Sequence, residues 1–114
     1  MAQYACLIYQ AEEPWAAGGP DVEAARAGFW KFREDHLDIL SAGEGLEPTS
    51  TATSLRRDSS GAITVTDGPF VETKEALGGF YILEAADLAA AIELAKEIPA
   101  IFGGVEIRPV LVFS

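Results

Sequence analysis

The chain has few of the residues that support disulfide, metal or nucleic-acid chemistry. Its 114 residues include one cysteine, one histidine and eight Lys or Arg residues against 18 Asp or Glu residues, so the net charge is −10. A single Cys6, with no other thiol or histidine nearby in the sequence, indicates neither an internal disulfide nor a zinc site, and we expect it in the core. Because phosphate binding needs clustered basic residues, and only Arg56 and Arg57 are adjacent, we expect no nucleic-acid partner.

Long apolar runs are also missing. The apolar run at residues 4–9 is too short to cross a bilayer, and no basic segment followed by a long apolar stretch opens the chain. We therefore expect a cytoplasmic protein with no signal peptide and no membrane partner. The length and the 49% hydrophobic content fit one domain over residues 1–114.

Catalytic motifs of the common kinds are absent as well. The sequence has no Ser-His-Asp order, no phosphate-cradling glycine loop and no cluster of metal ligands, so we expect neither a metal nor a nucleotide cofactor.

What the sequence does contain is a regular alternation of strand and helix patterns. Strands are expected at residues 4–9, 49–57, 62–66, 80–85 and 105–113. A helix is expected from an Asp21 N-cap to Ile39, ended by Gly43 and Gly45, and a second from an Asp87 N-cap to Pro99, with a loop at residues 12–20. The order β-α-β-β-β-α-β predicts an α+β, ferredoxin-like fold with two helices on one face of a mainly antiparallel sheet.

The expected strands are apolar on both faces, which two helices do not explain. Residues 4–9, 80–85 and 105–113 alternate between two apolar faces, while two helices cover only one face of such a sheet. We therefore predict a homodimer in which the two sheets pack face to face through a self-complementary interface.

Charged residues are concentrated in the stretch TDGPFVETKEALGG at residues 66–79. Asp67, Glu72, Lys74 and Glu75 lie here between two apolar runs. One interpretation is a structural lock, in which Asp67 accepts backbone hydrogen bonds and Lys74 pairs with a carboxylate. The other is a site in which Lys74, tuned by neighbouring carboxylates, binds an anion or moves a proton. Pro69 is expected to hold Gly68 in extended geometry.

Three further residues have two interpretations each. His36 falls on the apolar face of the expected first helix and is either a hydrogen-bonded core residue or a general base. Arg108 either pairs with Glu106 on the same strand face or holds a carboxylate substrate. Tyr9 either packs in the core or turns its hydroxyl into a cavity.

The residues DGPFVETKEALGGFYILEA, with LIY in the first expected strand and GGVEIRPV in the last, closely resemble the YCII-related domain family, in particular its DGPF branch. The resemblance covers nearly the whole chain. It implies a dimeric α+β barrel built on a ferredoxin-like unit. It also implies Asp67, Glu72, Lys74 and Glu75 as candidate site residues, with His36 as the available counterpart of a helix histidine used by enzymes of the wider family.

The resemblance implies less about activity, and two hypotheses follow. In the first, each half of the dimer binds a small, anionic molecule beside the DGPFVETKE loop, through Asp67, Glu72, Lys74, Glu75, Arg108 and Tyr9, with acid–base chemistry of isomerase or lyase type. In the second, the protein is a non-catalytic accessory whose loop docks on a regulator such as an extracytoplasmic-function sigma factor, because some members of this branch are encoded beside one.

Overall fold

The computed structural model describes residues 1–112 and contains six strands and three α-helices. The strands are β1 (Ala2–Gln10), β2 (Leu40–Gly45), β3 (Thr53–Arg57), β4 (Ile63–Asp67), β5 (Ala76–Ala85) and β6 (Gly103–Pro109). The helices are α1 (Glu12–Ala17), α2 (Pro20–Asp35), α3 (Leu88–Ala95) and a short 3-10 turn, η1 (Thr49–Thr51). None of the helices in residues 1–112 has the length and apolar character needed to cross a membrane.

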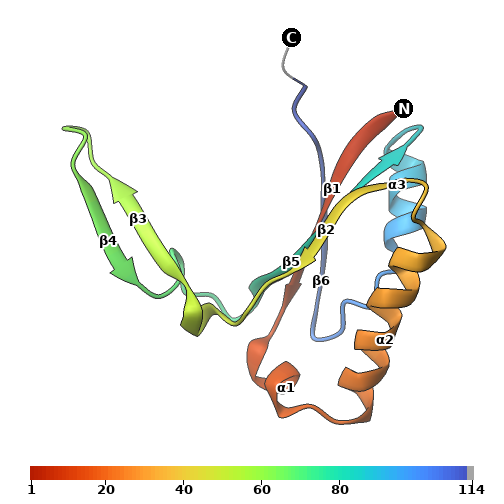
Figure 1. Cartoon of the computed structure of the whole chain (residues 1–114), viewed down its shortest axis with the longest axis horizontal. Helices are drawn as coiled ribbons and strands as arrows, with labels where there is room; N and C mark the ends of the chain where they lie inside the picture. The colour runs from red at the N-terminus through yellow and green to blue at the C-terminus, as the bar shows by residue number, and fades with distance from the viewer. Residues whose placement is uncertain (113–114) are drawn as a thin grey trace.

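The main sheet has the strand order β2-β5-β1-β6, and every pairing in it is antiparallel. Helices α2 and α3 both lie on one face of this sheet (Figure 1). The prediction of an α+β, ferredoxin-like fold is confirmed. β6 is an edge strand, which suits Pro109 because proline has no backbone N–H to donate to a further strand.

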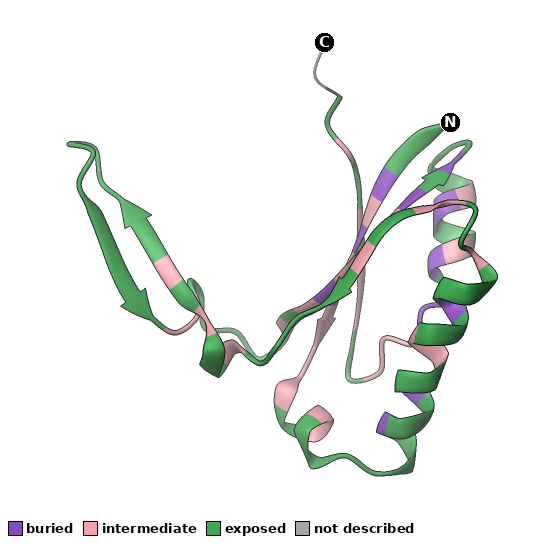
Figure 2. Ribbon diagram, in the orientation of Figure 1, coloured by how far each residue is buried: buried purple, intermediate pink, exposed green. Residues whose placement is uncertain are grey.

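The core lies between the helices and one face of the sheet, where the buried residues gather (Figure 2). It is formed by Tyr4, Cys6, Ile8, Phe32, Tyr81, Leu83, Ala85, Ala91, Ala95 and Ile98. Cys6 is fully buried, as predicted, and burial raises the pKa of its thiol to about 11. Because the thiolate is the reactive form, this cysteine is inert in the folded chain.

The end of the first long helix was predicted wrongly. α2 stops at Asp35, and His36 and the following turn lead into β2, which contains both Gly43 and Gly45. The sequence LSAGEG of β2 has almost no strand propensity, so its strand form comes from pairing with β5. Gly43 is needed there because a Cβ would come within 2.6 Å of the Tyr81 ring.

Other boundaries also differ from expectation. The predicted loop at residues 12–20 contains α1, which tolerates Pro14 in its first turn. Gly19, not Asp21, is the N-cap of α2, and Pro20 occupies the first turn. The Asp87 cap of α3 is confirmed, since its side chain accepts a hydrogen bond from the backbone N–H of Ala90 at 2.9 Å.

The last strand is shorter than predicted. β6 ends at Pro109, and the predicted strand end at Phe113 lies outside the described residues. The strand expected at residues 49–57 begins instead with η1.

The β3–β4 hairpin, called the arm below, stands away from the rest of the molecule (Figure 1). β3 and β4 pair with each other in a separate two-stranded sheet. The radius of gyration is 16.0 Å, whereas a compact chain of this length has about 13 Å. The arm therefore makes the single chain unusually open.

The sheet face opposite the helices, called the open face below, is also uncovered by any helix or strand within residues 1–112. Strand register places apolar side chains on it in pairs, since Leu7 lies opposite Phe80 and Ala5 lies opposite Ile82. The predicted second apolar face is confirmed for β1 and β5, whereas the prediction was wrong for β6, which places Glu106 and Arg108 on the open face.

Candidate functional site

A cavity of about 370 Å³ lies between α2 and the sheet, on the helix-covered side. Its walls come from α1, α2, β1, β2 and β5. The lining residues are Ile8, Gln10, Trp15, Arg26, Phe29, Trp30, Arg33, Gly43, Glu44, Gly45, Leu46, Gly78, Gly79, Phe80 and Tyr81.

Glycines create the space on the sheet side of this cavity. The β1–β5 register shifts between Ile8 and Tyr9, so Gly78 is an extra residue in β5. A Cβ on Gly78 would lie 2.7 Å from the Gln10 amide nitrogen, and a Cβ on Gly79 would lie 2.8 Å from the Glu44 carbonyl oxygen. The glycine pair therefore lets β2 and the Gln10 side chain approach β5 closely.

The Gln10 side chain brings an unpaired polar atom to the cavity. Its Oε1 is buried and has no hydrogen-bond partner among the described residues. A buried acceptor without a donor costs about 1–3 kcal/mol, so a ligand that donates a hydrogen bond here would recover that free energy.

Two arginines and two tryptophans surround the cavity mouth. The Arg26 guanidinium lies 5.3 Å from the Trp15 ring centre, and that of Arg33 lies 6.0 Å from Trp30. Neither arginine forms an ion pair within residues 1–112. Their positive charges are therefore held in place by aromatic rings and remain available to an anion.

Tyr81 links these arginines to the core. Its hydroxyl donates a hydrogen bond to the Phe29 carbonyl oxygen at 2.9 Å, and its ring packs 4.9 Å from that of Phe32. Burial raises the pKa of the Tyr81 phenol, and the charge of Arg33 opposes that rise. The phenol is therefore neutral at physiological pH and acts as a fixed wall of the cavity.

The predicted site residues of the DGPFVETKE loop lie elsewhere, on the surface between the arm and β5. The side chains of Asp67, Glu72, Lys74 and Glu75 are exposed and form no hydrogen bond or ion pair with any described residue. None of the four lines the cavity. Neither the predicted Lys74–carboxylate pair nor the predicted Asp67 lock is present in the single chain.

Backbone contacts hold this loop instead. The Gly68 N–H donates to the Ala52 carbonyl oxygen at 2.8 Å, and the Ser54 hydroxyl donates to the Gly68 carbonyl oxygen at 2.7 Å. Gly68 has φ of +104°, so the expected extended geometry is wrong, and the position requires glycine. Phe70 packs beneath Arg56, whose guanidinium lies 4.0 Å from the ring centre.

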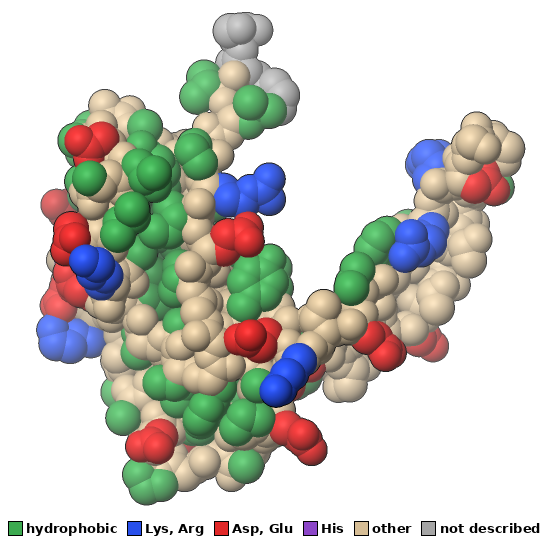
Figure 3. Space-filling view, turned by 180° about the vertical axis from the view of Figure 1, so that it is seen from behind, with side chains coloured by type: hydrophobic (Ala, Val, Ile, Leu, Met, Phe, Trp, Pro, Cys, Tyr) green, Lys and Arg blue, Asp and Glu red, His purple; other side chains and the backbone are tan. Residues whose placement is uncertain are grey.

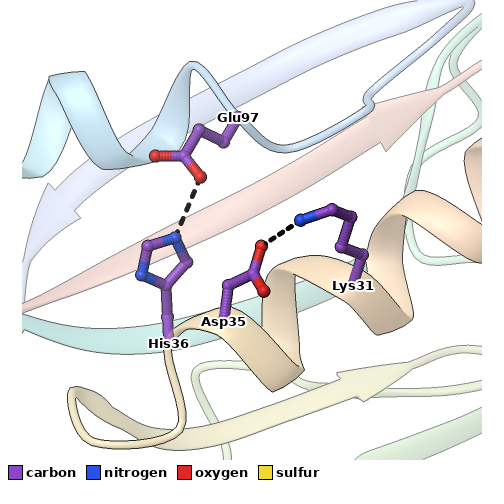
Figure 4. Close-up of polar contacts among 4 residues, drawn as sticks. All are labelled: Lys31, Asp35, His36 and Glu97. Carbon is purple, nitrogen blue, oxygen red and sulfur yellow. Dashed lines mark hydrogen bonds and ion pairs between the residues drawn. The ribbon is translucent and has the colours of Figure 1, made fainter.

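His36 lies at the C-terminal end of α2, away from the cavity. Its Nε2 lies 2.9 Å from the Glu97 Oε1, and its ring packs 4.7 Å from that of Phe32 (Figure 4). In the same view Lys31 pairs with Asp35 along the outer surface of α2. The imidazole joins the end of α2 to the segment that follows α3, which is the geometry of a hydrogen-bonded structural residue.

Replacing His36 by glutamine is expected to lower the free energy of unfolding by about 1 kcal/mol, because its hydrogen bond with the exposed Glu97 carboxylate is lost. Ligand binding in the cavity is expected to be unchanged. Chemical denaturation and a binding titration on the same sample measure both quantities. A variant with normal stability and lost binding would contradict the structural role of this residue.

Arg108 and Tyr9 also lie outside the cavity lining, on strands of the open face. The predicted pair between Arg108 and Glu106 is not among the ion pairs of residues 1–112. Tyr9 lies opposite Leu77 on one side and Gly104 on the other, and it is half-buried.

The residues that line the cavity were missed from the sequence, although a pattern was available. Arg26, Trp30 and Arg33 have the spacing i, i+4, i+7, which places them along one side of a helix. Trp30 is 65% exposed, and a large aromatic residue between two arginines on a helix surface is a recognisable feature of binding sites.

Comparison with known proteins gives one family and one relative. The profile of the YCII-related domain matches residues 2–114. A protein of Rhizobium meliloti (strain 1021), described as uncharacterized, is 42% identical over 73 residues, which cover 60% of this chain. The matched region spans 57% of that relative, a little over half its length.

Proposed function

The chain belongs to the YCII-related domain family, and within that family we propose that it is a homodimer whose protomers each bind a small organic anion with an aromatic body in the cavity beside α2. The observation that carries this proposal is the pairing of Arg26 with Trp15 and of Arg33 with Trp30 at the cavity mouth. Guanidinium groups recognise carboxylates, and the indole rings provide flat apolar surfaces for a ring.

The dimensions and polarity of the cavity support a ligand of this class. A volume of about 370 Å³ is at the lower end of the range for small-molecule sites, roughly 300–1,000 Å³. The unpaired Gln10 Oε1 offers a hydrogen-bond acceptor to a hydroxyl or amine group of the ligand. An anion with one aromatic ring and one hydrogen-bond donor matches the volume of the cavity, its arginine–tryptophan pairs and the Gln10 acceptor.

The overall charge of −10 works against an anionic ligand at long range. The attraction must therefore come from direct ion pairs and hydrogen bonds with Arg26 and Arg33, whose side chains are exposed to a ligand. We therefore expect a low association rate for anions, and a preference for those anions that also fill the apolar part of the cavity.

Tryptophan fluorescence tests the proposal directly, because both tryptophans of the chain line the cavity. Titration with benzoate is expected to change the emission with a saturable curve, while benzyl alcohol, of the same shape but neutral, is expected to bind at least roughly tenfold more weakly. Equal binding of the two compounds, or no saturable change with either, would contradict the proposal.

The exposed surface supports the homodimer. The single chain exposes 7831 Å², whereas a folded monomer of 12.1 kDa exposes about 6,000 Å². The excess of roughly 1,800 Å² is similar to what one subunit of an obligate dimer buries. Burial of the open face and of the arm in a homodimer would remove much of that excess.

Acid–base chemistry beside the DGPFVETKE loop and docking on a sigma factor stay predictions. A retained metabolite in native mass spectrometry favours the small-molecule hypothesis. Recovery of a sigma factor by the wild type and not by Lys74→Met favours the accessory one.

A further inference from the structure

The arm lacks the packing that a two-stranded sheet needs. An isolated hairpin is marginally stable in water and requires a third strand or a packed apolar face. One face of the arm carries Leu55, Ile63 and Val65, which are 57%, 49% and 63% exposed. In the single chain this apolar face has nothing against it (Figure 2).

The open face of the main sheet also lacks a layer that covers its apolar residues. Leu7, Phe80 and Ile82 form its apolar centre, and no helix or strand within residues 1–112 covers them. The arm and the body form the two sides of a wide V, with hydrophobic side chains on both sides of the gap (Figure 3). The arm of the same chain is thus held too far away to cover its own sheet.

We propose that each arm packs across the open face of a second copy of this chain, in a two-fold exchange of arms. This inference rests on the homodimer proposed above, and it places the partner's arm, and not the partner's sheet, against each open face. A two-fold axis places each arm in the opening of the other protomer, so both apolar surfaces of both chains are covered at once. The contact is closed and leaves no surface free for a third copy.

The charges of the two surfaces are complementary. Arg57 and Asp67 lie on the same face of the arm as Leu55 and Val65, because these residues alternate along paired strands. The open face carries Glu84, Glu106 and Arg108 by the same rule. Arg57 of the arm can therefore pair with a glutamate of the open face, and Asp67 can pair with Arg108. Such pairings use two of the eight basic residues of the chain.

The exchange also places the DGPFVETKE loop at the contact between the two protomers. Asp67 ends β4, and Glu72, Lys74 and Glu75 follow it between the arm and β5. Once the arm crosses to a second copy, this loop lies at the boundary between two protomers. Its unpaired charges in the single chain are then groups that face a partner.

Sedimentation of Val65→Asp tests the inference, with Thr64→Asp as the matched control. Both residues are exposed neighbours in β4 and both changes add one negative charge, but Thr64 lies on the other face of the arm. We expect Val65→Asp to raise the dimer dissociation constant at least roughly tenfold, and Thr64→Asp to change it little.

The outcomes separate the two proposals. A wild type that sediments as a dimer, with Val65→Asp and Thr64→Asp behaving alike, would overturn the exchange of arms and leave the homodimer intact. A wild type of monomeric mass at micromolar concentration would overturn both.

A spin label locates the arm directly. The label is attached to Thr64→Cys, on the face of the arm that stays outside the contact, since buried Cys6 does not react in the folded chain. Labelled protein is then mixed with ¹⁵N-labelled wild type so that mixed dimers form. We expect the amide signals of β1 and β5 in the ¹⁵N chain to broaden. Broadening elsewhere, with these strands unaffected, would overturn the proposal.

Discussion

Gly103→Ala is expected to destabilise the fold by about 3 kcal/mol, near the upper end for overpacking substitutions. A Cβ at Gly103 would overlap the carbonyl oxygen of Tyr9, and it would lie 2.7 Å from the Glu75 carboxylate. The first of these atoms belongs to the backbone of β1, which pairs with β6 at this point. The clash is relieved only by breaking the ladder between the two strands.

Gly104→Ala is the matched control, because its Cβ has no atom within 4 Å. Both substitutions reduce the conformational entropy of the unfolded chain by the same amount, so the difference between their free energies of unfolding measures the clash. Denaturant midpoints at two protein concentrations measure the effect and separate it from any change in dimer formation. Equal stability of the two variants would show that β1 and β6 are not held at this register.

The second large effect is expected at the cavity. Arg33→Met should weaken benzoate binding by roughly 10- to 100-fold, because a charge-assisted hydrogen bond contributes about 1.5–3 kcal/mol. Arg26→Met should act similarly, and the double variant should bind benzoate no better than it binds benzyl alcohol. The fluorescence titration described above gives these constants.

Lys31→Met is the control for this prediction. It removes the same charge from the same helix, but Lys31 pairs with Asp35 on the outer surface of α2 and does not line the cavity. A loss of affinity as large in Lys31→Met as in Arg33→Met would mean that total charge, and not the cavity, controls binding.

The parts of the fold that the sequence predicted are those with strong local patterns. β1 and β5 are rich in apolar and aromatic residues, and Asp87 caps α3 by a purely local hydrogen bond. β2 was missed because LSAGEG becomes a strand only through its pairing with β5. That pairing joins residues about forty positions apart, which no local pattern records.

The candidate site was harder to predict for a related reason. The loop was predicted as the site because four charged residues lie close together in the sequence, whereas the cavity combines residues of α1, α2, β1, β2 and β5. Gln10, Trp15 and Arg33 become neighbours only after the sheet has formed. Periodicity along α2 was the one accessible indication, through Arg26, Trp30 and Arg33.

The strand order has a consequence for how the chain acquires its structure during synthesis. β1 is made well before both of its neighbours in the sheet, β5 and β6. The main sheet therefore cannot close until those two strands have left the ribosome, and the long sequence separation of these pairings slows that step. The β3–β4 hairpin, whose strands are joined by a five-residue turn, has its pairing partners close together in the sequence and leaves the ribosome earlier. The nascent chain thus exposes the apolar residues of an unpacked hairpin before the main sheet forms, and chaperone occupancy should be greatest over that interval.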